Sequence, residues 1–91
     1  MQEVLSKPEV SNKPLHEQVF FSLHLVDLHE SWKPLFKVVE SRFAWSEIDG
    51  RFMGDRIATE TLAALEQARK RYEDRRLDLV HEGFVLSDLD F

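Results

Sequence analysis

The stretch that most constrains this chain runs from Asp55 to Gly83, DRIATETLAALEQARKRYEDRRLDLVHEG. Ala, Leu, Glu, Gln, Arg and Lys dominate it, and these residues have high helix propensity. Apolar residues recur along one helical stripe from Ile57 to Tyr72. Gly83 suits the residue after a helix, where a positive φ is common. The pattern therefore predicts a long helix over about 55–82.

The length and charge of this predicted helix divide it into two parts. A helix of about 25 residues is roughly 37 Å long, which exceeds the width of a small domain. We therefore expect its first half to pack in the core and its charged second half to project and bind a partner. A solvated face with weak local ion pairs is the simpler explanation of the same charges. The candidate partner-binding residues here are Arg69, Tyr72, Arg75, Arg76 and Leu79.

The chain before this helix divides into an arm and a domain. Residues 1–14, MQEVLSKPEVSNKP, contain two of the three prolines and few branched apolar residues, so they are predicted to form a mobile N-terminal arm. Residues 15–91 are expected to form a single small globular domain, because a chain of 91 residues supplies only one core.

Residues 15–28, LHEQVFFSLHLVDL, are compatible with two structures. In a strand, Val19, Phe21 and Leu23 share one face, while polar residues alternate with them. In a helix, the apolar residues of this segment are split between opposite sides. The strand leaves fewer apolar groups misplaced, so it is the structure we expect, and a helix here is the alternative.

Residues 31–43, SWKPLFKVVESRF, are predicted to form a helix. Trp32, Phe36 and Val39 follow helical spacing and would share one face. Pro34 is acceptable in the first turn of a helix, where backbone N–H groups lack intrahelical partners.

Two short strands complete the prediction. Asp49–Gly50 indicates a hairpin within residues 43–54, because a type I′ turn requires positive φ at both central positions. Residues 84–87 can form a final short strand. The predicted fold is α+β, with a small antiparallel sheet, two helices and the β–α–β–β–α–β order of ferredoxin-like domains. The alternative is an all-α three-helix bundle, which would suit the low number of β-branched residues.

Composition limits the possible functions. The chain has no cysteine, which excludes disulfides and thiolate metal sites and fits a reducing, cytoplasmic location. A formal net charge of −5 argues against general nucleic-acid binding, which needs a surplus of Lys and Arg. No apolar run is long enough to span a bilayer, and Met1 begins no recognisable signal peptide, so no membrane association is expected.

The sequence also lacks catalytic signatures. It contains no P-loop, no Gly-rich dinucleotide motif and no H-E-x-x-H pair, so we assign no catalytic residue, metal ligand or cofactor. The four histidines, His16, His24, His29 and His81, are the candidates for an acid–base or metal site, and a cluster of His24, Asp27 and His29 would support one. His24 and Asp27 would share a face only if residues 15–28 formed a helix.

The C-terminal residues Leu86–Phe91, LSDLDF, interleave acidic and apolar side chains. They resemble the short peptides that dock into hydrophobic grooves edged by basic residues, including the tips of bacterial single-strand-binding proteins and sliding-clamp-binding motifs. The glutamine that usually starts the clamp motif is Leu86 here. The resemblance implies that Leu89 and Phe91 bind a partner, whereas the alternative is that they fold back onto the domain.

These observations favour a small acidic protein-binding or regulatory module that is not an enzyme. We expect it to act through the second half of the long helix and through the C-terminal residues. Its partner is expected to be a protein, which includes a second copy of itself in a homodimer or larger oligomer. The alternative is a small enzyme or ligand-binding domain that uses His24 and neighbouring polar residues.

Overall fold

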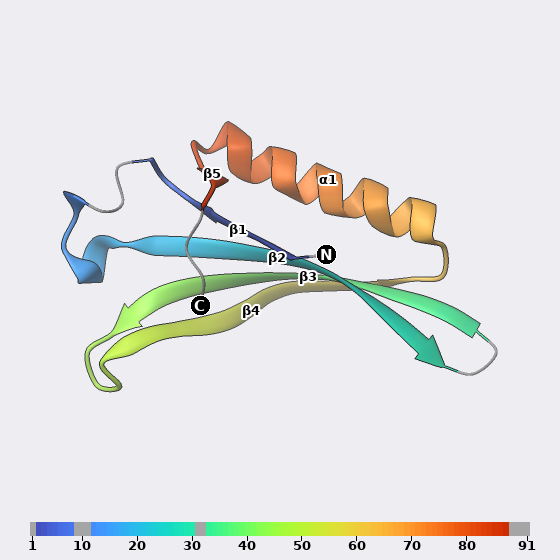
Figure 1. Cartoon of the computed structure of the whole chain (residues 1–91), viewed down its shortest axis with the longest axis horizontal. Helices are drawn as coiled ribbons and strands as arrows, with labels where there is room; N and C mark the ends of the chain where they lie inside the picture. Colours follow the sequence, from blue (N-terminus) through green and yellow to red (C-terminus); the bar gives the residue numbers. More distant parts are fainter. Residues whose placement is uncertain (1, 9–11, 31–32, 88–91) are drawn as a thin grey trace.

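The described part of the chain folds into one antiparallel sheet with one α-helix on one face (Figure 1). The computed structural model describes residues 2–8, 12–30 and 33–87. The strand order in the sheet is β4-β3-β2-β1-β5. The elements in chain order are β1 (Gln2–Ser6), the 3₁₀ turn η2 (Leu15–Glu17), β2 (Val19–Glu30), β3 (Lys33–Ser46), β4 (Arg51–Leu62), α1 (Leu65–His81) and β5 (Val85–Leu86).

Strand β2 confirms the strand predicted within residues 15–28. Its alternation assigns one set of side chains to each face of the sheet. Leu23 and Leu25 are buried in the core cluster beneath α1. Phe20 and His24 lie on the opposite face, because they alternate with those leucines.

The predicted helix over residues 31–43 is wrong, since Lys33–Ser46 form strand β3. This strand is central and pairs with β2 on one side and β4 on the other. Phe36 and Val38 lie two residues apart and share the core face of the strand. Phe36 and Val39 lie three residues apart, which is the spacing of neighbours on one side of a helix, so this segment fits both periods. Pairing with two neighbouring strands outweighs the helical pattern. Trp32 lies outside the described residues.

The predicted helix over 55–82 is wrong in its first part. Residues 51–62 form β4, which continues the hairpin from β3, and α1 begins only at Leu65. The β-branched residues Ile57, Thr59 and Thr61 suit this strand. At 17 residues, α1 is about 25 Å long, and it lies along the sheet (Figure 1).

The fold belongs to the α+β class, but the predicted number and order of its helices and strands are wrong. The described order is β–β–β–β–α–β, with a five-stranded sheet and one helix. Both the ferredoxin-like order with two helices and the three-helix bundle are therefore wrong.

The predicted hairpin is present, but its turn differs from the expected type. The strands close at Ser46 and Arg51, around four intervening residues. Gly50 has a φ of 63°, whereas Asp49 does not have a positive φ, so the turn is not type I′. The Gly50 N–H donates to the Ser46 carbonyl at 2.8 Å, and the Asp49 N–H donates to Ser46 Oγ at 3.2 Å.

Residues of the predicted N-terminal arm form part of the sheet. Gln2–Ser6 form β1, which pairs with both β2 and β5. Leu5 is fully buried in the core cluster. The Tyr72 hydroxyl of α1 donates to Glu3 Oε1 at 2.6 Å, which ties the helix to this strand.

The face of the sheet away from α1 carries aromatic side chains near the hairpin. The rings of Phe20 and Trp45 each meet Phe52 edge to face, at 5.2 Å and 5.3 Å between centroids. Gly54 lies within β4, opposite Phe43. A Cβ at Gly54 would come within 2.9 Å of three Phe43 ring atoms, so glycine lets that ring lie against the strand.

The core lies between α1 and the face of the sheet that this helix covers. Its buried members are Leu5, Leu23, Leu25, Phe36, Val38, Ala68, Tyr72, Leu79 and Phe84. Tyr72 is fully buried, and its hydroxyl lies 3.5 Å from the Leu23 carbonyl in addition to its bond to Glu3. The helix is therefore held to the sheet by apolar packing and by one buried phenol.

Replacing Tyr72 with Phe is expected to lower the free energy of unfolding by about 1–2 kcal/mol, because Glu3 loses its buried donor. Urea denaturation followed by circular dichroism measures this change. Glu3→Gln is the matched control: it keeps a side-chain oxygen as acceptor for Tyr72 and loses only the charge that faces Arg76. A Tyr72→Phe midpoint equal to that of the wild type would contradict the assignment of this bond.

Candidate functional site

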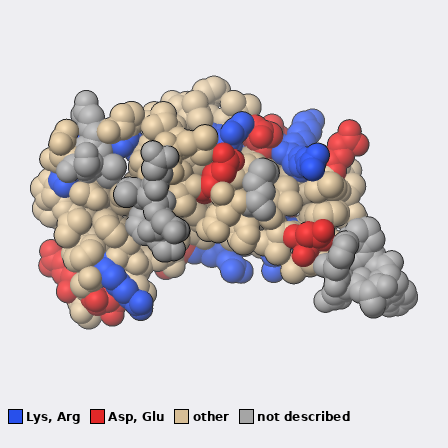
Figure 2. Space-filling view, viewed as in Figure 1, with Lys and Arg blue, Asp and Glu red and all other residues tan. Residues whose placement is uncertain are grey.

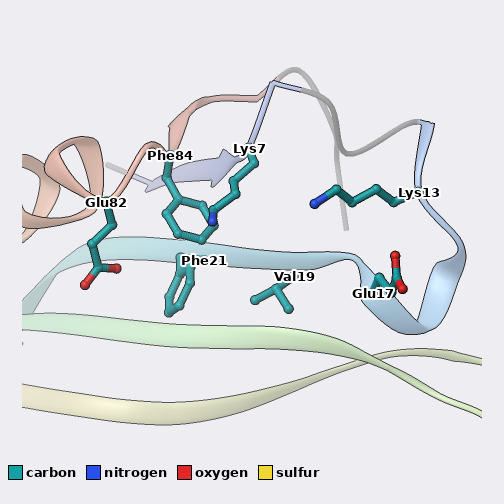
Figure 3. A pocket seen from close by; sticks show the side chains of 7 residues that line it. All are labelled: Lys7, Lys13, Glu17, Val19, Phe21, Glu82 and Phe84. Carbon is teal, nitrogen blue, oxygen red and sulfur yellow. The ribbon is translucent and has the colours of Figure 1, made fainter.

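A pocket of about 280 Å³ opens where β1 ends, β2 begins and α1 ends (Figure 3). Its lining combines apolar, basic and acidic side chains from four separate parts of the chain. The lining residues are Lys7, Lys13, Glu17, Val19, Phe21, Glu82 and Phe84.

The floor of this pocket is aromatic. The rings of Phe21 and Phe84 meet edge to face, with centroids 4.9 Å apart and planes at 83°. Phe84 belongs to the buried core cluster, and Phe21 packs against that cluster. The floor is therefore continuous with the core and firmly held.

The end of α1 places Phe84 in the pocket. Gly83 has a φ of 98°, as its sequence position predicts. The Gly83 N–H donates to the Val80 carbonyl and the Phe84 N–H to the Leu79 carbonyl, each at 3.0 Å. These two bonds are those of a Schellman motif, in which apolar residues on either side of the glycine pack together. Leu79 and Phe84 do so here, since both belong to the core cluster.

Two lysines stand at the mouth of the pocket. The Lys7 ammonium lies 5.4 Å from the centroid of the Phe84 ring, a cation–π distance. Figure 3 shows the Lys7 side chain lying over the Phe84 ring and the Lys13 ammonium extending toward that ring from the other side of the opening. No carboxylate of the described residues lies within ion-pair distance of either lysine, although Glu17 and Glu82 also line the pocket.

The chemistry of this lining suits binding. It offers an apolar floor, ammonium groups and carboxylates, and none of the described lining residues has a hydroxyl or imidazole side chain. A nucleophile paired with a base is the usual requirement for covalent catalysis. The pocket can accept an apolar group and contact charges on either side of it.

The structure places the predicted partner-binding residues of α1 mostly against the chain itself. Tyr72 and Leu79 are buried in the core, beneath the helix. Arg75 faces Glu60 at 3.6 Å, and Arg76 pairs with Glu73 at 2.7 Å. The second half of the helix thus packs on the sheet instead of projecting beyond it.

Three other predicted residues have different positions. Arg69 is exposed and lines a separate hollow of about 370 Å³ with Leu25, Asp27, Phe36 and Leu65. Leu89 and Phe91 lie outside the described residues.

The histidine site proposed as an alternative does not come together around β2. His24 lies on the face away from α1, whereas Asp27 lines the hollow beside the helix residue Leu65. The side chain of His29 lies outside the described part of the chain. Among the described residues, no group of three or more His, Asp or Glu side chains could hold a metal ion.

Charges elsewhere on the molecule are mixed in sign. Figure 2 shows acidic and basic side chains interspersed on the face in view. A hollow of about 340 Å³ between β4 and α1 is lined by Leu62, Gln67, Lys70, Arg71 and Asp74, and none of these described residues is aromatic. Within the described segments, no helix has the length and apolar character needed to cross a membrane.

No family model, curated protein or solved structure matched this chain. The sequence did not point to the pocket, because Lys7 and Lys13 fall in the expected arm. The one available signal was Gly83 followed by Phe84, since a glycine cap is commonly accompanied by an apolar contact.

Beneath the helix, Glu40 of β3 lies in an unfavourable electrostatic position. Burial raises the pKa of its carboxyl above the ordinary value, the positive charge of Arg75 opposes this shift, and Asp78 and Glu82 add to it. The folded state therefore holds a proton on Glu40 more tightly than the unfolded state does, and the ionised form destabilises the fold.

Glu40→Gln is expected to raise the free energy of unfolding near pH 7. Because the pKa of Glu40 is raised on folding, the destabilisation by its ionised carboxyl decreases as the pH falls through the folded-state pKa toward 4.5, and the advantage of the variant shrinks there. Urea denaturation of the wild type and the variant at several pH values from 7 down to 4.5 measures the difference in their free energies of unfolding. Glu47→Gln, at an exposed position of the hairpin turn, is the control. A variant less stable than the wild type at neutral pH would contradict this account.

Proposed function

We propose that this chain is a non-enzymatic interaction module that binds a partner protein in the pocket between β1, β2 and the end of α1. The bound element is an apolar side chain flanked by carboxylates. The observation that supports this proposal is the pair of packed rings, Phe21 and Phe84, beneath two lysines that lack carboxylate partners among the described residues.

The two parts of the pocket contribute differently to binding. Contact with the aromatic floor removes apolar surface from water, which supplies about 25 cal/mol per Å². Lys7 and Lys13 attract carboxylates at the rim, where such charges mainly set orientation and association rate. Glu17 and Glu82 disfavour ligands with a carboxylate on their side of the opening, so they restrict the orientation of the partner.

The outer edge of β4 is a weaker candidate for binding by strand addition. This strand ends the sheet and, in the described residues, pairs only with β3. A register irregularity interrupts that pairing between Glu40 and Ser41. Arg51, Asp55 and Arg56 are exposed along the edge. Bulges and charged side chains are features that protect edge strands from pairing with other chains.

Titration with a peptide of the proposed chemistry tests this function. Acetyl-Asp-Leu-Glu-amide is expected to shift the backbone amide resonances of Val19, Phe21 and Phe84 in a ¹⁵N-labelled sample, because its leucine would meet the floor. Acetyl-Asn-Leu-Gln-amide, which lacks the carboxylates, is expected to bind about tenfold more weakly.

Two matched variants distinguish the effect of charge at the pocket from the effect of the protein's net charge on peptide binding. Lys7→Glu/Lys13→Glu is expected to weaken binding of the acidic peptide by about tenfold or more. Arg69→Glu/Lys70→Glu makes the same change in net charge at exposed positions near the start of α1, whereas the pocket lies at the end of that helix, and it is expected to leave binding unchanged. Equal binding by the acidic and amide peptides, or shifts confined to other surfaces, would refute the proposal.

A further inference from the structure

The tip of the β3–β4 hairpin carries the chemistry that the pocket is proposed to bind. Ile48 is 98% exposed, the largest exposed fraction among the large apolar side chains of the described residues. Glu47 and Asp49 flank it, and both are exposed. The tip therefore presents an apolar side chain between two carboxylates.

The tip is also held in one conformation. The Ser46 hydroxyl donates to Asp49 Oδ2 at 3.1 Å, and the Asp49 N–H donates to Ser46 Oγ at 3.2 Å. Gly50 closes the turn with its bond to the Ser46 carbonyl and its positive φ. A preorganised tip loses little conformational entropy when it binds.

Tip and pocket lie at the same end of the sheet (Figure 1). Val19, which lines the pocket, is paired with Ala44, only two residues before the turn begins after Ser46. The tip belongs to β3 and β4, whereas the pocket lies over β2 and β1, at a lateral distance of about 10 Å. The exposure of Ile48 means that the tip does not occupy the pocket of its own chain.

We propose that the partner bound in the pocket is the hairpin tip of a second copy of this chain, an inference that rests on the proposed function. Because both features lie at one end of the molecule, two copies that meet end to end about a two-fold axis can exchange tips. Ile48 of each copy contacts Phe21 and Phe84 of the other, while Glu47 and Asp49 face Lys7 and Lys13. Such an isologous contact closes after two copies.

Reciprocal charge reversal tests this dimer in the full-length chain. One variant is Glu47→Lys/Asp49→Asn, in which asparagine keeps an oxygen acceptor for Ser46. The other is Lys7→Glu/Lys13→Glu. Sedimentation equilibrium from about 10 µM to about 1 mM protein, at about 50 mM salt, measures association with little screening.

The expected pattern is specific to a tip-in-pocket contact. The wild type forms a dimer and nothing larger, and each variant alone associates about a hundredfold more weakly, because the dimer contains two contacts that each weaken about tenfold. An equimolar mixture of the two variants recovers dimerisation, because both contacts in the mixed dimer again join opposite charges. A wild type that stays monomeric at the highest concentration overturns the inference, and so does a mixture that associates no better than its components.

The apolar contact has its own control pair. Ile48→Ala is expected to weaken the dimer at unchanged net charge, whereas Leu77→Ala, at an exposed position on α1, leaves it unchanged. Equal effects of the two substitutions would count against the inference.

The peptide titration distinguishes this inference from the function on which it rests. If the acidic peptide binds the pocket while the wild type stays monomeric, the proposed function stands and the second copy is excluded as the partner. If a peptide of residues 86–91, LSDLDF, binds the pocket of a monomeric wild type, the C-terminal residues are the occupant and the dimer is again excluded. Failure of both peptide and dimer overturns both proposals.

Discussion

The packing of α1 on one face of the sheet is the interaction on which the rest of the molecule depends. Tyr72 lies at its centre, fully buried, with its hydroxyl bonded to Glu3 of β1 and close to the Leu23 carbonyl of β2. The helix is thereby fixed against two strands at once, and its last turn ends at a defined position. The Schellman motif then directs Phe84 onto Phe21, so the pocket is a consequence of where the helix ends.

The sequence allowed β2 to be predicted because Leu23 and Leu25 alternate with polar side chains over a segment too irregular for a helix. Strand β3 could not be recognised in the same way, since Phe36 fits a helical period with Val39 and a strand period with Val38. What decides between them is pairing with β2 and β4, which no local pattern contains. The same limitation extended the predicted helix into β4, where β3 supplies the partner that outweighs helix propensity.

Much less of the candidate site could be predicted. The arginines of the helix were predicted to bind a partner because they cluster in sequence, yet Arg75 and Arg76 face carboxylates of the same chain. The pocket joins residues that are far apart in sequence, such as Lys7, Phe21 and Phe84, and only the folded sheet brings them together. Spacing rules detect sites within one element, whereas this one is made by the meeting of three.

The pairing of β1 with β5 has a consequence for the biosynthesis of the chain. Leu5 is paired with Leu86, and Glu3 receives its hydrogen bond from Tyr72, so the first strand is complete only after the helix and β5 have left the ribosome. The β2–β3–β4 meander, by contrast, is made of neighbouring segments and needs nothing from the far end of the chain. At roughly 5–20 residues per second, synthesis of the roughly 25 residues from the end of β4 to the end of β5 takes about one to five seconds. The face of the sheet that contains Leu23 and Leu25 stays open to water until the helix packs over it.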